Sequence, residues 1–249
     1  MPETDTGGVA RRAPLSRERV LDAAVALADA DGLAAVTIRS LANALGLKPM
    51  SLYHYVRGKE DVLDGMVDRV FAEIDLPEAR SPWRAAIRAR AISARAVLAR
   101  HPWALTILDS RSAPGPATLR HHDAVLGVLL GAGLSLPMTA RAYTLVDAYV
   151  YGFVLQEAAV PSGGRDGGGN GEQPGGQPAV PDAGRYPHLA VFAEVHVLRP
   201  GYSFGDEFEP GLDLILDMVE TLTEPRSRSE RAKREDVPPQ ERLILGGEG

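Results

Sequence analysis

The sequence predicts an all-α protein, and three observations carry that prediction. Apolar residues recur every three or four positions along most of the chain, which is the spacing of one helix face. Alternation of apolar and polar residues, the pattern of a half-buried strand, is nearly absent. Glycine, proline and capping residues stand where the helical runs begin and end. With 249 residues, the chain is long enough for one or two domains with a substantial core.

The first predicted helix runs from Ser16 to Asp31, with Ser16 as its cap and Gly32 as its stop. Its apolar face consists of Val20, Ala23, Ala24, Leu27 and Ala30. A second, shorter helix is predicted between a Thr37 cap and Gly46. The chain therefore begins with two helices joined by a short connection.

Proline at the first helical position favours a third helix opening at Lys48-Pro49. A longer helix is expected from near Gly58, where Glu60 and Asp61 lie close to the positive end of the helix dipole. Further helices are predicted over residues 82–100, 103–110, 116–132, 137–160, 187–198 and 207–223.

Three segments contain little that can be buried, and we expect them to be disordered. They are the N-terminus 1–14, a flexible insert at 161–185 in which nine of 25 residues are Gly and four are Pro, and the tail 225–249 with charges of both signs. The remainder divides into a first domain over 15–62 and a larger helical domain over 63–224.

Composition and motifs exclude several classes of protein. The absence of cysteine excludes a disulfide framework, a thiolate metal site and a cysteine nucleophile, and it fits an expected cytoplasmic location. The longest uncharged stretch, Ala124 to Ala140, contains four Gly or Pro among 17 residues, so no membrane span is expected. Because the chain has no phosphate-binding glycine loop, HExxH motif or nucleophile elbow, we expect neither an enzyme nor a cofactor or metal.

The charge of the chain is distributed unevenly. A net charge of −6 argues on its own against nucleic acid as a partner. Residues 32–59, however, contain four basic and no acidic residues, so this window carries +4 and the rest of the chain −10. Inside the window, the inner faces of two short helices are formed by Leu41, Ala42, Leu45, Leu47 and Leu52. With Gly46 at the tight turn, this is the geometry of a helix-turn-helix, whose second helix enters the major groove of DNA.

The segment TIRSLANALGLKPMSLYHYVRGKEDVLDGM at 37–66, together with the preceding capped helix, resembles the TetR family of transcriptional repressors. The matching residues are Ala24, Gly32, Thr37, Leu41, Ala42, Leu45, Gly46, Leu52, Tyr53, Tyr55, Val56, Lys59 and Leu63. Farther on, Trp83 and the segment FEPGLDLILDMVETL at 208–222 resemble the C-terminal domain of the tetracycline-repressor branch. The resemblance implies a three-helix DNA-binding domain followed by a larger domain for dimerisation and effector binding.

The resemblance also implies which residues contact DNA. Side chains that can donate to phosphate oxygens are Thr37, Ser51, Tyr53 and Lys59. The residues expected at base edges are Arg39, which suits guanine, and Lys48, Pro49, Met50 and His54 of the recognition helix. For His54, base contact and solvated surface both remain open, and Leu52 and Tyr55 are interpreted as core. Lys48 stands where the family commonly has a Ser or Thr cap, so the angle of the recognition helix is also open.

In the larger domain, an apolar seam with coiled-coil-like spacing is predicted to form half of a four-helix dimer interface. The residues of this seam are Phe208, Leu212, Ile215, Val219 and Leu222. The apolar helix 137–160 is expected at the same interface, with Tyr149 and Phe153. The alternative is a core helix within a monomer. The effector pocket is expected to contain Trp103, His121, Val125, Asp147, Tyr151, Phe192 and His196. A competing interpretation makes Asp147 a buried acid satisfied by the hydroxyls of Tyr143 and Tyr151.

These features predict a homodimeric, ligand-responsive repressor. It would bind a palindromic operator in double-stranded DNA, with half-sites about one helical turn apart, and would be released by a small hydrophobic or aromatic effector. The helix beginning near Gly58 would couple the two domains. An effector-independent regulator, or an activator, remains an alternative. An enzyme that uses the helical pocket would leave the helix-turn-helix unexplained.

Overall fold

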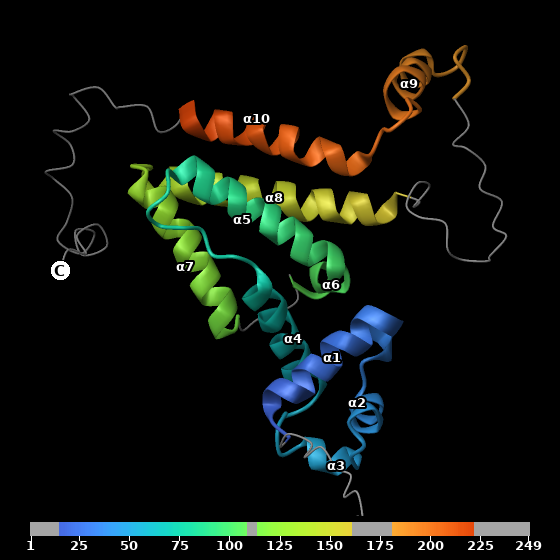
Figure 1. Ribbon diagram of the computed structural model, residues 1–249, viewed down its shortest axis with the longest axis vertical. Helices are drawn as coiled ribbons and strands as arrows, with labels where there is room; N and C mark the ends of the chain where they lie inside the picture. The colour runs from blue at the N-terminus through green and yellow to red at the C-terminus, as the bar shows by residue number, and fades with distance from the viewer. Residues whose placement is uncertain (1–14, 109–113, 161–180, 222–249) are drawn as a thin grey trace, which may run out of the picture.

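The computed structural model describes residues 15–108, 114–160 and 181–221. Every regular element in these ranges is a helix, which confirms the all-α prediction. Figure 1 shows a small helical unit at one end of the molecule and a larger helical body at the other, with α4 leading from one to the other. No described helix is long and apolar enough to cross a membrane. Within the described ranges, no group of three or more His, Asp or Glu residues is arranged to hold a metal ion.

The small unit is built from α1 (Arg17–Asp31), a 3-10 turn (Leu33–Ala35), α2 (Ile38–Leu45) and α3 (Pro49–Leu52). Side chains and turn residues fix its helix ends. Ser16 Oγ accepts from the Arg19 amide at 3.3 Å, and Thr37 and Ser40 cap α2 reciprocally. Gly46 ends α2 with φ of 69° in the left-handed region, which glycine adopts without a Cβ clash. These local interactions produce the predicted turn between α2 and α3.

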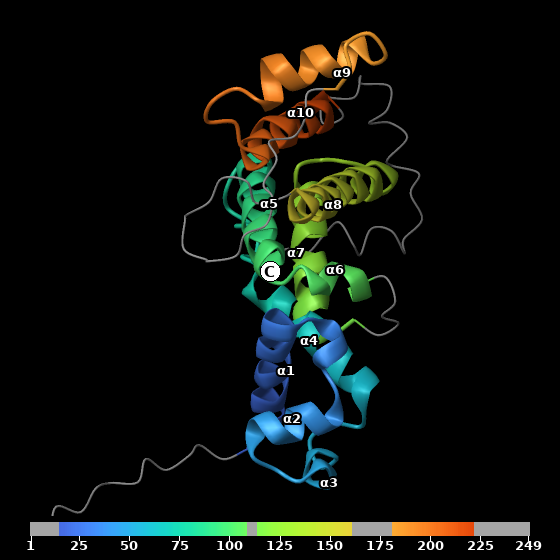
Figure 2. The same ribbon diagram turned by 90° about the vertical axis from the view of Figure 1, so that its right-hand side faces the viewer.

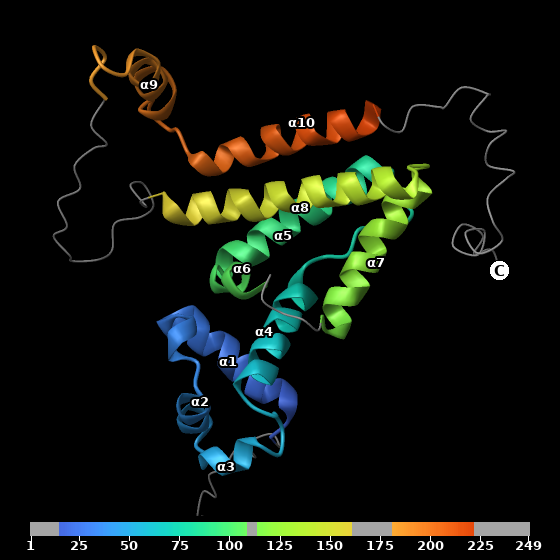
Figure 3. The same ribbon diagram turned by 180° about the vertical axis from the view of Figure 1, so that it is seen from behind.

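The body is built from α4 (Lys59–Glu73), α5 (Trp83–Arg100), α6 (Trp103–Leu108), α7 (Pro116–Gly131), α8 (Leu136–Ala159), α9 (Pro187–Phe192), a π-helical turn (Ala193–Val197), a 3-10 turn (Phe204–Glu207) and α10 (Phe208–Thr221). In Figures 1 and 3, α8 and α10 run side by side at the far end from α3, and α5 lies next to both of them. α7 and α4 run side by side toward the small unit. α9 lies beyond one end of α10, apart from the rest of the body (Figures 1 and 3).

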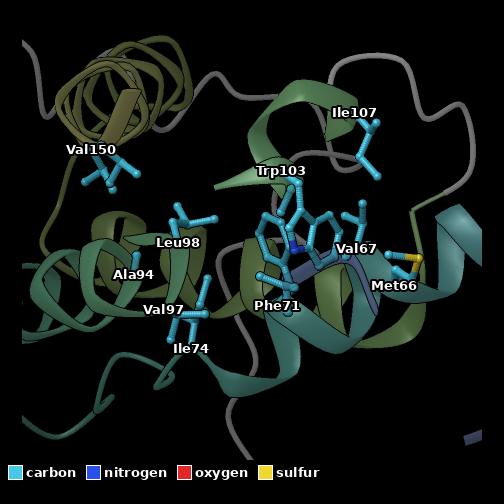
Figure 4. Close-up of a cluster of buried hydrophobic side chains, with 14 of the residues drawn as sticks. Met66, Val67, Phe71, Ile74, Ala94, Val97, Leu98, Trp103, Ile107 and Val150 are labelled. Carbon is cyan, nitrogen blue, oxygen red and sulfur yellow. The ribbon is translucent and has the colours of Figure 1, made fainter. Parts of the chain in front are cut away.

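One hydrophobic core extends through both parts of the molecule, from Val20 in α1 to Val219 in α10. Figure 4 shows its central region, where Trp103 of α6 lies beside Val67 and Phe71 of α4. Because α4 contributes buried residues along its whole length, the small unit and the body share a core rather than meeting at a hydrated joint.

Polar bonds also join the small unit to the body. Asp29 of α1 accepts from the indole Nε1 of Trp103 at 2.7 Å and lies 2.8 Å from Nδ1 of His101. At the other end of α1, Arg17 donates to both carboxylate oxygens of Asp61 in α4, each at 2.7 Å. This pairing with Arg17 lowers the pKa of Asp61. Both ends of α1 are therefore held by groups outside it.

Most predicted helices agree with the structure to within one or two residues, and one differs in kind. The range 187–198 divides into α9 and a π-helical turn, whereas 207–223 agrees with α10, of whose predicted range only Glu207 belongs to the preceding 3-10 turn. The predicted boundary between residues 62 and 63 falls inside α4, so this helix belongs to both parts.

The segments 1–14 and 225–249, residues 161–180 of the predicted insert, and Leu222 lie outside the described residues. Residues 181–185 of the insert are described and include a hydrogen-bonded turn at Asp182.

Candidate functional site

The end of the molecule formed by α2 and α3 presents the residues expected to contact DNA (Figure 2). On α3, Leu52 is fully buried against the core, so the opposite side of the helix faces solvent. Met50 on that helix is 74% exposed, and Tyr53, which follows its last residue, is 50% exposed. Met50 is the most exposed of the large apolar side chains that the structure describes. Such exposure leaves an apolar contact surface without an intramolecular partner, as expected for a base-reading helix.

The remaining predicted contacts surround this helix. Of them, Thr37, Arg39, Lys48, Pro49, His54 and Lys59 are exposed, and Ser51 is half-buried. Thr37 has a second role, since its hydroxyl caps α2 by accepting from the Ser40 amide at 3.0 Å. Tyr55 is half-buried against the core, and its carbonyl accepts from Arg17 at 3.2 Å. Leu52 and Tyr55 thus pack inward, as interpreted from the sequence.

A cavity of about 480 Å³ lies between α4, α6, α7 and α8. Its described lining consists of Asp64, Val67, Phe71, Leu108, Pro114, Gly115, Thr118, His122, Tyr143, Thr144, Asp147, Ala148 and Tyr151. Apolar and aromatic groups dominate, with a few polar groups at fixed positions, which is the composition of a small-molecule site.

Behind the cavity, a buried arginine organises the polar groups. Arg90 of α5 is 1% exposed, and its Nη1 donates to Asp147 Oδ1 at 2.5 Å. Its Nε donates to His121 Nε2 at 3.0 Å. On the cavity side, the Tyr151 hydroxyl donates to Asp147 Oδ2 at 3.4 Å. Burial together with the neighbouring Arg90 charge lowers the pKa of His121 to about 3, so this histidine is neutral.

An aromatic wall forms another side of the cavity. The rings of Phe71 and His122 stack with centroids 5.9 Å apart, and the Tyr143 hydroxyl bonds to His122 Nδ1. Burial lowers the pKa of His122 and raises the pKa values of Tyr143 and Tyr151. At neutral pH, these three side chains are therefore uncharged.

One contact ties α4 to the mouth of the cavity. Asp68 Oδ1 of α4 accepts from the backbone amide of Thr118 at 2.8 Å and from its hydroxyl at 3.0 Å. The carboxylate thereby binds the first turn of α7, where free amides favour negative charge. Gly115 packs so closely on Asp68 that a Cβ would collide with the carboxyl group. Asp68 thus ties the first turn of α7 to α4.

Comparison with known proteins decides the family. Residues 20–66 match the family described as bacterial regulatory proteins, tetR family, and residues 76–223 match the tetracyclin repressor-like C-terminal domain. The chain belongs to the TetR family. As a member, it is a DNA-binding transcriptional regulator and not an enzyme.

Relatives of this TetR-family chain include repressors. The HTH-type transcriptional repressor DrrR1 of Streptomyces coeruleorubidus is 37% identical over 232 residues, which cover 89% of this chain and 84% of DrrR1. The class A tetracycline repressor protein from transposon 1721 of Escherichia coli is 32% identical over 163 residues, which cover 64% of this chain and 74% of that one. Among solved structures, the TetR family protein ActR of Streptomyces coelicolor, in complex with actinorhodin, has the same fold. Its TM-score is 0.67 at 23% identity, covering 86% of this chain and all of ActR.

Two of the seven residues expected in the effector pocket, Asp147 and Tyr151, line the cavity of this TetR-family chain. Trp103, His121 and Val125 are buried behind it, where Trp103 binds Asp29 and His121 binds Arg90. Phe192 and His196 lie on α9 and the turn after it, outside the lining. His196 pairs there with Glu207 at 2.9 Å. The structure thus points to a pocket nearer to α4 than the sequence suggested.

The residues expected at the dimer interface of the TetR-family chain mostly face its own core. Phe153, Phe208, Leu212 and Val219 are buried within one chain, and Tyr149 and Ile215 are half-buried. The acidic side of α10 pairs with α5, since Arg88 bonds to Asp213 at 3.1 Å and to Glu209 at 2.6 Å. On the side left over, Leu214 is 71% exposed and Met218 is 47% exposed. The predicted seam of α10 therefore packs mainly within one chain. The apolar face of α10 that points outward is a different one, formed by Leu214 and Met218.

Several site residues escaped the sequence reasoning. Arg90 interrupts an apolar helical face between Ile87 and Ala94, and a lone cation in such a position is a signal of a buried ion pair. Phe71 and Asp68 carry no comparable signal, because residues on α4 can serve the core, the cavity or solvent, and their neighbours on other helices decide which.

Proposed function

We propose that this chain is a homodimeric repressor that binds a palindromic operator and is released by a small aromatic effector. One observation carries the proposal. α4 begins directly after the recognition unit and, one to three turns later, supplies Asp64, Val67 and Phe71 to the wall of the cavity. A ligand in this cavity touches the same rigid helix that positions the DNA-binding face.

At the DNA, the proposal assigns phosphate contacts to Thr37, Ser51, Tyr53 and Lys59. Base contacts are assigned to Arg39, Lys48, Pro49, Met50 and His54. Their exposure around α3 supports the assignment. Phosphate contacts supply affinity and register, whereas base contacts supply the choice of sequence.

Release follows from differential binding. An effector that fits the cavity better when α7 and α4 shift relative to α8 stabilises that arrangement. In a dimer, tilting both α4 helices changes the spacing of the two recognition helices, which must match half-sites about 34 Å apart. The Asp68–Thr118 contact supports this route, because it ties the two shifting helices together next to the ligand.

The lining and a structural relative support an aromatic effector. Phe71, Tyr143 and Tyr151 offer aromatic faces. ActR, which shares the fold, was solved in complex with actinorhodin.

The effector proposal can be tested by operator release. Aromatic compounds are screened for thermal stabilisation of the protein, and those that bind are added to protein on fluorescently labelled upstream DNA. Ala148→Trp, which fills the cavity, should abolish both stabilisation and release. Ala96→Trp, at an exposed position on α5 outside the lining, should abolish neither. Binding that leaves the anisotropy of the DNA unchanged would contradict the proposal.

The homodimer is proposed to use the outward faces of α8 and α10. Leu145 and Leu155 of α8 and Leu214 and Met218 of α10 are exposed large apolar side chains. Two such neighbouring helices from each copy would form a four-helix interface.

Sedimentation tests this interface directly. Leu214→Glu would bury two charges at a two-fold contact, so we expect monomers with unchanged helicity and with lost operator binding. Leu119→Glu, at an exposed position on α7, is the control and should remain dimeric. A dimer formed by the Leu214→Glu variant would place the interface elsewhere.

A further inference from the structure

The connection from α3 back to α4, residues 53–58, lies at the exposed end of the molecule (Figure 1). α3 is only four residues long, so its own hydrogen bonds contribute little to its orientation. On the inner side, Leu52 at the end of α3 and Val56 in the connection are buried in the core. On the outer side, Asp61 in the first turn of α4 accepts from the backbone amide of Arg57 at 2.8 Å. The course of the connection therefore depends on contacts outside α3.

Arg17 of α1 completes this outer contact. Its guanidinium donates to both carboxylate oxygens of Asp61, each at 2.7 Å, and its Nη1 also donates to the Tyr55 carbonyl at 3.2 Å. Bidentate pairing of this kind fixes the relative orientation of the two groups. Asp61 thus joins α1, α4 and the connection 53–58 at one point, and Arg17 offsets its charge.

A hollow of about 440 Å³ opens at the surface beside this point. Its lining consists of Arg17, Tyr53, His54, Tyr55, Val56, Arg57 and Asp61. Tyr53, His54 and Arg57 are exposed, and the one acid of the lining is held by Arg17. Within the part of the chain that the structure describes, the Arg57 guanidinium has no ion-pair partner. A hollow rich in donors beside a DNA-reading helix suits a phosphate group.

We propose that Arg57 is a further contact to the DNA backbone, with a phosphate group entering this hollow, and that Asp61 is the positioning residue that holds Arg57 there. The inference rests on the proposed docking of α3 in the major groove, and it adds one phosphate contact together with its support. Phosphate contacts fix the register of a protein on the duplex. A connection that loses its support would therefore also displace the bases that α3 reads.

The carboxylate of Asp61 can affect DNA binding in two ways, and their signs are opposite. By charge alone it repels the phosphate backbone, so its removal would strengthen binding. As a positioning group it holds the connection, so its removal weakens binding. Asp61→Asn has the same shape, but its amide nitrogen cannot accept from Arg17 or from the Arg57 amide. We expect this variant to bind operator DNA about tenfold more weakly, which corresponds to the loss of one hydrogen bond to a charged group.

Asp22→Asn is the matched control. Asp22 of α1 pairs with Arg69 of α4, so this variant also removes a carboxylate that joins the same two helices. Asp22 is exposed and lies outside the lining of the hollow. Its operator affinity should stay within about twofold of the wild type. Both variants of the full-length protein are compared by the anisotropy of labelled upstream DNA, below their melting temperatures.

The salt dependence of binding reports the phosphate contact itself. Arg57→Ala should reduce the slope of log K against log salt by about 0.9 per protomer, on upstream DNA and on a duplex of unrelated sequence alike. Asp61→Asn should reduce the slope similarly, whereas a loss of folding stability alone would leave it unchanged. Adding Arg57→Ala to Asp61→Asn should have no further effect. Arg141→Ala on α8 is the charge-matched control and should keep the wild-type slope.

The outcomes separate these roles from the proposed function. Equal or tighter operator binding by Asp61→Asn, an unchanged slope in Arg57→Ala, or additive losses in the double variant overturns the roles of Arg57 and Asp61. If Arg39→Ala still weakens operator binding in the same assay, the proposed DNA face stands and only these two roles fail. If none of the three single variants changes binding, the DNA face lies elsewhere and the proposed function fails as well.

Discussion

Arg90 of α5 and Asp147 of α8 form a buried ion pair, with Nη1 and Oδ1 2.5 Å apart and Nε of Arg90 bound to His121. Together with His121 of α7, the pair joins three helices at the back of the cavity. Because one carboxylate oxygen faces Arg90 and the other faces Tyr151, the pair also fixes a polar group of the lining. Arg90 Nη2 has no hydrogen-bond partner among the described groups.

Arg90→Met should lower the free energy of unfolding by about 3–5 kcal/mol, because it leaves the Asp147 carboxylate buried without its partner. Arg90→Met combined with Asp147→Leu should cost less than Arg90→Met alone. Urea denaturation of the single and double variants measures the coupling. Arg100→Met, at another arginine of α5, removes an exposed ion pair with Glu73 of α4 and should cost less than about 1 kcal/mol. Strictly additive costs for Arg90 and Asp147 would contradict a coupled pair.

Stability should fall in mild acid because of His121. Its pKa is about 3 in the folded protein, so the folded state keeps this histidine neutral, whereas the unfolded chain takes up a proton near the usual pKa of about 6.5. The unfolded state is therefore favoured increasingly as the pH falls from about 6.5 toward 3, by about 1.4 kcal/mol per pH unit from this group.

His121→Gln can still accept from Arg90 but does not titrate in this range. Its unfolding free energy should fall less steeply than that of the wild type between pH 6.5 and 5, measured by urea denaturation. Parallel pH profiles for the two proteins would show that His121 is not the titrating group.

Arg39→Ala should weaken binding to the cognate operator by about 1–3 kcal/mol and reduce discrimination at one base pair. Arg39 is exposed at the second residue of α2, beside the recognition helix. Titration of labelled operators carrying each base at each position measures the effect, with Arg141→Ala on α8 as the charge-matched control. A uniform loss over all sequences would identify Arg39 as a phosphate contact.

Gly115→Ala should destabilise the protein by about 1–3 kcal/mol and weaken the link between effector binding and DNA release. The added methyl group would displace the Asp68 carboxylate that binds the first turn of α7. Gly127→Ala, where a Cβ meets no atom within 4 Å, should instead stabilise α7 by about 0.5–1 kcal/mol. Thermal melts and effector titrations on the operator compare the two variants. Unchanged coupling in Gly115→Ala would place the route between cavity and DNA elsewhere.

The sequence predicted correctly those features that depend on neighbouring residues in the chain. The Ser16 and Thr37 caps, the Gly46 turn and the proline opening α3 act within one turn of chain, and the structure has them where the sequence indicates. The exposure of Met50 and Tyr53 follows from the same turn and from the burial of Leu52. The cavity does not, because its walls come from four helices separated by up to about 90 residues. Phe192 and His196 have the right chemistry for a lining, but α9 lies apart from the cavity.

The sequence by itself determined the helical class, the recognition unit and the likeness to TetR-family repressors. These follow from periodicity, capping and motif spacing, all of which are read along the chain. The tertiary structure decided which face of each amphipathic helix meets which neighbour. It placed Phe208 and Leu212 inward and Leu214 outward, and it brought Arg90 to Asp147 across 57 positions. The physical reason is that burial and charge pairing are properties of contacts between helices, and helix spacing alone does not specify the partner.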